Sequence, residues 1–278
     1  MKRNMKLAIG VIVVVAVVLA LVYNYMQLTG VSSLASYDND PVSIGTYLQL
    51  QSVATNMTLA DQVGQGIAGQ YPFQLPTRIN GTPIVTDGKP TMIYIGAEYC
   101  PYCAVSRWGM VLALMRFGHF NTLHYMTSSA TDVYKSTPTF TFYNSTYNSS
   151  YIDFQPVEET TNQGPPYAVL QTPDALQNDT FYTYNPNGGI PFIDFGNRSI
   201  QSGASVYPSD IGSAISVLPK YDWAQIISML NQTNTTVSQA VIGNANIYTA
   251  QLCEIDNFTP ASVCSAPFVK QILTKEGF

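Results

Sequence analysis

Two cysteines separated by two residues constrain the fold more than any other feature of this sequence. The Cys-Pro-Tyr-Cys motif at 100–103 follows a β-rich apolar run at 91–95. Helical apolar spacing over 100–117 comes next and ends at Gly118, and a further strand is predicted at 123–127. This order of strand, turn, dithiol, helix and strand predicts a βαβ unit with both sulfur atoms at the start of its helix.

The first cysteine of the motif has the features of a nucleophile. Cys100 falls at the predicted N-cap, where unpaired backbone N–H groups and the positive end of the helix dipole favour a thiolate. Cys103 lies one turn later, where it can displace a disulfide formed at Cys100, and Pro101 at the first helical position loses no hydrogen bond. We therefore predict a redox-active Cys100–Cys103 disulfide, with no other cofactor and no metal site.

The N-terminal segment predicts a membrane anchor. Residues 7–28 carry no charge, and their length is enough to cross about 30 Å of hydrocarbon. Basic residues precede this run and none follows it before Arg78, which predicts a cytosolic N-terminus and an extracellular remainder. A cleaved signal peptide is the alternative. The chain is thus divided into an anchor, a spacer and one extracytosolic domain, at 1–28, 29–40 and 41–278.

The composition indicates an exported glycoprotein. Charged residues make up only 10% of the chain, against roughly 25% in an average soluble protein. The net charge of −5 leaves no basic surface for nucleic acid. Glycans on nine Asn-x-Ser/Thr sequons would supply the missing surface polarity. The alternative is that a high Asn and Thr content alone explains the number of sequons. The nine asparagines are Asn56, Asn80, Asn144, Asn148, Asn178, Asn197, Asn231, Asn234 and Asn257.

A second cysteine pair lies near the C-terminus. In an exported protein, Cys253 and Cys264 are expected to form a structural disulfide that closes a short loop. A zinc site shared with Cys100 and Cys103, or a relay that passes electrons to the dithiol, are the alternatives. The pair belongs to a C-terminal helical segment at 206–278, with helices predicted at 206–218, 221–230 and 237–252.

Residues 96–103 resemble the active-site segment of the thioredoxin superfamily. The resemblance implies an α/β, thioredoxin-like fold, a central mixed sheet flanked by helices, with a cis-proline loop opposite the dithiol. Residues 188–195 fit this loop, which implies a cis Ile190–Pro191 bond beside Cys100. The surroundings of the active site would then include Glu98, Tyr99, Pro101 and Tyr102.

The sequence departs from the superfamily pattern at two places. The buried acid of the superfamily would fall at Tyr94 and is absent, with Glu98 as the nearest acid in sequence. The interval from Cys103 to Pro191 is about twice that of a minimal thioredoxin, so we expect a Tyr-, Thr- and Asn-rich insertion at about 128–183, formed by a β-hairpin and a loop near the site.

The anchor, the dithiol segment, the insertion and the late cysteine pair together resemble a family of anchored archaeal thioredoxin-like proteins, domain of unknown function 929. This resemblance implies a fold and a location, and no activity.

These features predict a single-pass membrane protein at the cell surface that acts as a thiol-disulfide oxidoreductase. Its partners would be cysteine pairs of exported proteins, or a redox partner protein. The alternatives are a non-enzymatic, glycosylated envelope scaffold or complex subunit with structural disulfides, and a metal carrier that uses the dithiol.

Overall fold

The computed structural model describes residues 17–18, 34–73, 75–212 and 220–276. Apart from Val17 and Val18, the predicted anchor at 1–28 lies outside these residues. Within the described ranges, no helix combines the length and the apolar character needed to cross a membrane.

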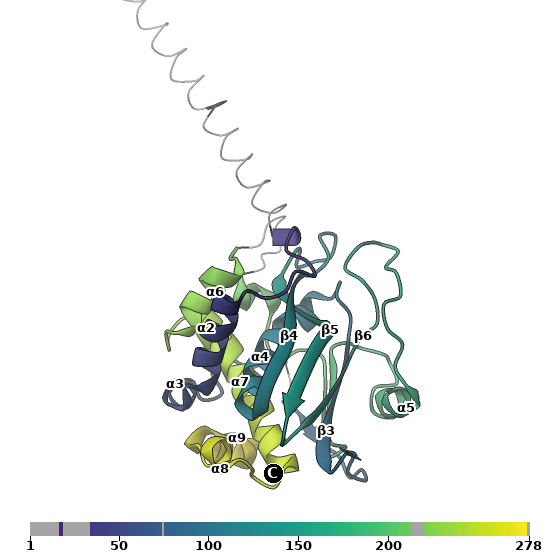
Figure 1. The fold of residues 1–278 in the computed structure, drawn as a ribbon, viewed down its shortest axis with the longest axis vertical. Helices are drawn as coiled ribbons and strands as arrows, with labels where there is room; N and C mark the ends of the chain where they lie inside the picture. The colour runs from purple at the N-terminus through teal and green to yellow at the C-terminus, as the bar shows by residue number, and fades with distance from the viewer. Residues whose placement is uncertain (1–16, 19–33, 74, 213–219, 277–278) are drawn as a thin grey trace, which may run out of the picture.

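A mixed sheet forms the centre of the fold (Figure 1). Its middle strand, β3 (Lys89–Gly96), is buried from Thr91 onward, as expected of a continuous apolar run covered on both faces. It pairs in parallel with β6 (Asp153–Glu158) and antiparallel with β7 (Phe192–Phe195). Beyond β7, the sheet continues antiparallel through β8 (Ser199–Ser202) and then β1 (Thr77–Arg78). The short strand β2 (Val85–Thr86) precedes β3 and forms a hairpin with it.

The helix that carries the dithiol lies at the core of the molecule. In α4 (Pro101–Phe117), every residue except Tyr102 is buried. α4 packs against α7 (Thr236–Ile255), and further helices gather on the same side of the molecule in Figure 1. These are α2 (Ile44–Thr55), α3 (Met57–Val63), α6 (Trp223–Leu230), α8 (Ala261–Cys264) and α9 (Pro267–Glu276), while α5 (Ala175–Tyr184) lies on the opposite side.

The strand predicted at 123–127 exists, but it does not complete the βαβ unit. It belongs to β4 (Gly118–Thr127), which pairs antiparallel with β5 (Pro138–Ser149) in a separate two-stranded sheet. The strand parallel to β3 is β6, which begins 26 residues after the end of β4. The region at 128–183, predicted as a β-hairpin and a loop, contains β5, β6 and most of α5, because local β-propensity marks a strand without indicating its partner.

The hairpin covers one side of α4. Trp108 Nε1 donates a hydrogen bond to the Pro138 carbonyl at 2.8 Å, and Thr139 Oγ1 donates one to the Ala104 carbonyl at 2.7 Å. These bonds satisfy two of the buried polar groups of this helix, which has no polar face.

Two of the three predicted C-terminal helices are confirmed. They correspond to α6, which Asp222 caps through a bond from Gln225 N at 2.8 Å, and to α7. Of the helix predicted at 206–218, the described part contains the 3-10 turn η1 (Pro208–Ile211), and 213–218 lies outside the described residues.

Candidate active site

Cys100 occupies the N-cap of α4, as predicted. Its backbone is extended, and its Sγ accepts a hydrogen bond from the Cys103 backbone N–H at 3.1 Å. Pro101 is the first helical residue. The cysteine sulfur thus takes the place of the oxygen acceptor usual at an N-cap, and the start of the helix favours negative charge on it.

A proline loop faces this sulfur from another part of the chain. The Ile190–Pro191 bond is cis, as predicted, and the Ile190 carbonyl lies 3.9 Å from Cys100 Sγ. The antiparallel pairing of β7 with β3 brings these residues together, although they are 90 positions apart. A bond from Gly203 N to the Pro191 carbonyl, at 2.7 Å, holds the loop in place.

Cys100 and Cys103 are both free thiols, so the predicted disulfide between them is not formed here. Sequence does not fix this state, because the oxidation state of a dithiol depends on its potential relative to that of its surroundings. Cys100 exposes 5% of its surface and Cys103 none, so a substrate can approach only the first sulfur.

Burial raises the pKa of the Cys103 thiol well above its usual value, and its contact with Cys100 acts in the same direction. The positive charge of Arg107 and the backbone of Ala97 oppose this rise. The second thiol therefore needs help from its surroundings to react as a thiolate.

A fully buried ion pair lies behind the dithiol. Arg107 Nε and Nη2 donate to the two carboxylate oxygens of Glu158 at 2.8 and 2.6 Å, and Nη2 also donates to the Ala97 carbonyl at 2.7 Å. Both side chains are 0% exposed. Sequence analysis did not find this pair; the available signal was one arginine within the apolar spacing of the predicted helix.

Glu98 is a second buried acid near the site. It is 3% exposed, and Thr141 Oγ1 donates to its carboxylate at 2.9 Å. Burial, followed by repulsion from Glu158, raises the pKa of Glu98 to about 7. The carboxyl group can therefore take up or release a proton near neutral pH.

Aromatic side chains and a pocket lie near Cys100. Tyr99 stacks on Tyr167 with their ring centroids 4.2 Å apart, and Tyr102 meets Tyr134 edge-to-face at 5.8 Å. A pocket of about 440 Å³ adjoins the proline loop and is lined by Pro72, Phe73, Tyr102, Ile190, Ser202, Gly203 and Ala204. Its mostly apolar walls suit a side chain that neighbours a substrate cysteine.

Residues 76–174 match the model of a family described as a domain of unknown function (DUF929). The matched region runs from β1 past the dithiol and the β4–β5 hairpin to the residues before α5. No curated protein and no solved structure matches the chain.

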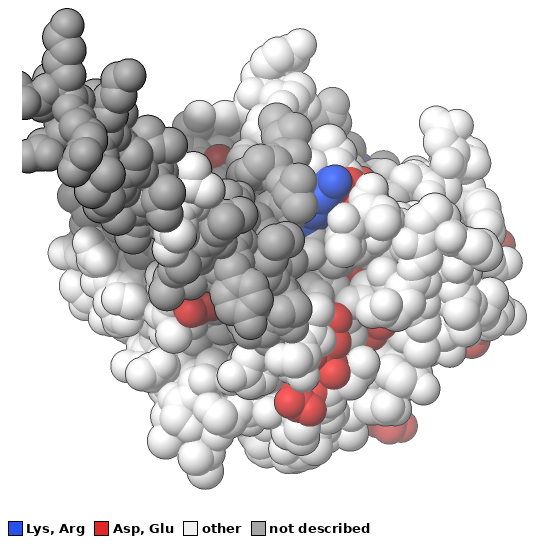
Figure 2. Space-filling view, turned by 90° about the horizontal axis from the view of Figure 1, so that it is seen from above, with Lys and Arg blue, Asp and Glu red and all other residues white. Residues whose placement is uncertain are grey.

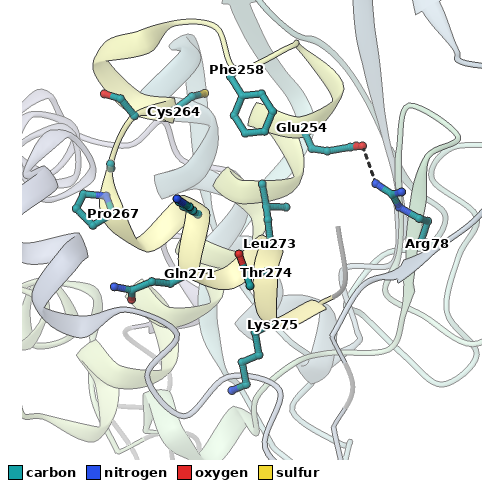
Figure 3. A pocket seen from close by; sticks show the side chains of 12 residues that line it. Arg78, Glu254, Phe258, Cys264, Pro267, Gln271, Leu273, Thr274 and Lys275 are labelled. Atoms are coloured by element: carbon teal, nitrogen blue, oxygen red, sulfur yellow. Dashed lines mark hydrogen bonds and ion pairs between the residues drawn. The ribbon is translucent and has the colours of Figure 1, made fainter.

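Cys253 and Cys264 form the predicted disulfide. In the described part of the chain, no three metal-ligating side chains lie together as a zinc site would require. A pocket of about 1030 Å³ lies beside this disulfide and includes neither dithiol cysteine. An ion pair of 3.2 Å between Arg78 and Glu254 crosses one side of it (Figure 3).

Most side chains on the face seen in Figure 2 are neither acidic nor basic, which agrees with the low charge of the sequence. Eight of the nine sequon asparagines are exposed. The exception is Asn197, which is half-buried and donates through Nδ2 to the Thr82 carbonyl at 2.9 Å. Its amide is therefore occupied within the fold.

Proposed function

We propose that this chain is a thiol-disulfide oxidoreductase with a thioredoxin-like fold, held in the membrane by residues 1–28 with its dithiol on the outer side. Its substrates are cysteine pairs of other exported proteins. The observation that carries the proposal is the position of Cys100, whose Sγ lies at the start of a helix and 3.9 Å from the carbonyl of the cis-proline loop.

The strand order supports the proposed fold. A strand, the dithiol helix and a parallel strand (β3, α4 and β6) are followed by a helix and two antiparallel strands (α5, β7 and β8). After the short helix α6, the long helix α7 packs against α4. The cis-proline immediately precedes β7 and faces the dithiol. In this arrangement, the β4–β5 hairpin is an insertion between α4 and β6.

The geometry favours attack by Cys100. Its sulfur has the larger exposure of the two, and it accepts the helical N–H of Cys103, which stabilises a thiolate. The Cys100 thiolate attacks one sulfur of the substrate disulfide, and the other sulfur leaves as a thiolate. Cys103 then attacks Cys100 Sγ, which forms the internal disulfide and releases the second substrate thiol.

The test uses the full chain in detergent. We expect a Cys100–Cys103 reduction potential above about −300 mV, the value below which disulfides behave as inert structural bonds. Cys103→Ala is expected to accumulate a mixed disulfide with a peptide that carries a single disulfide. The matched control, Cys100→Ala, removes the accessible sulfur and is expected to accumulate none.

The glycosylated scaffold predicts the opposite result. A potential below about −300 mV, together with no trapped peptide on Cys103→Ala, would leave the dithiol with a structural role only. Stoichiometric zinc or copper in the purified reduced protein would instead support the metal carrier.

A further inference from the structure

Two buried hydrogen-bond donors lie behind the dithiol. The hydroxyl of Tyr94 and Nη1 of Arg107 are fully enclosed, and among the described residues neither makes a hydrogen bond of normal geometry. The nearest acceptor for the Tyr94 hydroxyl is the Glu158 carboxylate, whose pKa it lowers but whose two oxygens already accept from Arg107. An unsatisfied buried donor costs about 1 to 3 kcal/mol, and more when it is charged. Two such groups in one place suit an acceptor that carries negative charge.

The Tyr94 hydroxyl lies beside the second sulfur of the dithiol. Tyr94 and Gly96 are two residues apart on β3, so they face the same side of the sheet. A Cβ added at Gly96 would overlap the Tyr94 hydroxyl and lie 3.1 Å from Cys103 Sγ. The missing side chain of Gly96 therefore leaves the space in which the hydroxyl and the sulfur approach each other.

Arg107 reaches the same place from the helix. It follows Cys103 by four residues on α4, and helical side chains lean toward the N-terminus, over the preceding turn. Glu158 and Ala97 occupy Nε and Nη2, which leaves Nη1 available. The positive charge of Arg107 also lowers the pKa of Cys103.

We propose that Tyr94 and Arg107 form a donor pair that stabilises the Cys103 thiolate while it resolves the mixed disulfide. This inference rests on the proposed function, because a thiolate at Cys103 is needed only if a substrate is bound to Cys100. The hydroxyl and Nη1 supply the two hydrogen bonds that a buried thiolate would otherwise lose with water.

The resolution step balances without a further reactant. Cys103 gives up its proton, and its sulfur attacks Cys100 Sγ. The bond between Cys100 and the substrate sulfur breaks as the Cys100–Cys103 bond forms. The departing substrate sulfur keeps the electron pair of the broken bond and leaves as a thiolate. It then takes up one proton, which balances the proton that Cys103 lost. Two electrons therefore pass from the dithiol to the substrate disulfide.

The charges around Cys103 make such donors necessary. Besides Tyr94 and Arg107, the titratable groups that act on Cys103 or on Tyr94 are Cys100 at the N-cap of α4, Glu158 on β6 and Tyr99 before the helix. Glu158 is held by Arg107, and a Cys100 thiolate would repel a second negative charge. When Cys100 is bound to substrate, that repulsion is removed and the donors can act on Cys103.

The test compares Tyr94→Phe with the wild-type full chain in detergent. The chromogenic disulfide DTNB is mixed with the reduced protein, and each attack releases one coloured thiolate. The first phase reports attack by Cys100, and the second reports resolution by Cys103. Since a hydrogen bond to a charged group contributes about 1.5 to 3 kcal/mol, we expect Tyr94→Phe to slow the second phase roughly ten- to hundredfold and to raise its pH midpoint by about one to two units.

Unfolding and a matched variant separate this role from a structural one. Tyr94→Phe removes a hydroxyl that makes no hydrogen bond of normal geometry in the described residues, so its free energy of unfolding is expected to stay within about 1 kcal/mol of the wild type. The control, Tyr248→Phe, removes a buried hydroxyl on α7 that accepts from Gln201 at 3.4 Å, and it is expected to leave the second phase unchanged.

Three outcomes would overturn the inference. An unchanged second phase in Tyr94→Phe would do so, as would equal slowing of both phases. A loss of stability with normal resolution would assign the hydroxyl to Glu158 instead. Failure of the proposed function gives a different result: the wild type would then show no rapid first phase. Failure of the donor pair leaves that first phase intact.

Discussion

Replacement of Arg107 by methionine is expected to destabilise the protein strongly. The substitution leaves the Glu158 carboxylate at 0% exposure without the two bonds of 2.8 and 2.6 Å that now satisfy it. Breaking a buried ion pair by removing one partner typically costs about 3 to 5 kcal/mol, because the remaining charge is uncompensated. The Ala97 carbonyl also loses a donor at 2.7 Å, so we expect Arg107→Met to fall in the upper half of that range.

Removal of both charges is expected to restore most of this stability. In Arg107→Met/Glu158→Leu, neither charge of the ion pair remains, and apolar groups of similar volume replace the pair. We expect the double variant to unfold within about 1 kcal/mol of the wild type while its DTNB second phase remains slow, because Nη1 is gone. The pair would then matter more for chemistry than for folding.

Urea unfolding of the full chain in detergent measures both variants. Trp108 on α4 and Trp223 on α6 are 0% and 6% exposed, so their fluorescence reports loss of the core around the site. The free energies follow from linear extrapolation with a shared slope. A cost below about 1 kcal/mol for Arg107→Met, or a double variant as unstable as the single one, would refute the reasoning.

Further predictions concern pH, glycans and the second disulfide. The pKa of Glu98 is raised to about 7 in the folded state, so the free energy of unfolding is expected to fall by up to about 3 kcal/mol as the pH rises from about 4.5 to 7. Glu98→Gln is expected to remove this loss when unfolding is compared at pH 5 and 8. The same loss of stability in the variant would contradict the prediction. In a host that glycosylates the sequons, Asn197→Gln is expected to leave the intact mass of the glycans unchanged, whereas the exposed control Asn178→Gln removes one glycan. Replacement of Cys253 and Cys264 by alanine is expected to lower the free energy of unfolding by about 2 to 3 kcal/mol, since the loop spans 11 positions, and a shift in the dithiol potential would contradict a purely structural role.

The dithiol segment was predictable because its signals are local. The apolar run of β3, Cys100 as N-cap and Pro101 at the first helical position each depend on neighbours in sequence. The cis bond before Pro191 came instead from a family resemblance, because no local pattern fixes the isomer of a proline bond.

Glu158 could not be predicted in the same way. It becomes part of the site through the parallel register that sets it opposite Gly96, and that register depends on tertiary packing. β6 is also a weak strand in sequence, with Pro156 and several polar residues, which an edge strand tolerates and a buried one does not. The strong pattern of β4 therefore concealed the true parallel partner of β3.

Gly96 connects the fold to the chemistry proposed for the site. Its pairing with Glu158 fixes the acid that holds Arg107, and its missing side chain leaves room for both the Tyr94 hydroxyl and Cys103 Sγ. Any larger residue at this position would displace the hydroxyl or the sulfur, because β3 is buried and leaves no free direction for either. β3 thus helps to place Glu158, Arg107 and the Tyr94 hydroxyl around the Cys103 thiol. β3 and α4 follow each other in sequence, whereas Glu158 comes from β6, which lies further along the chain.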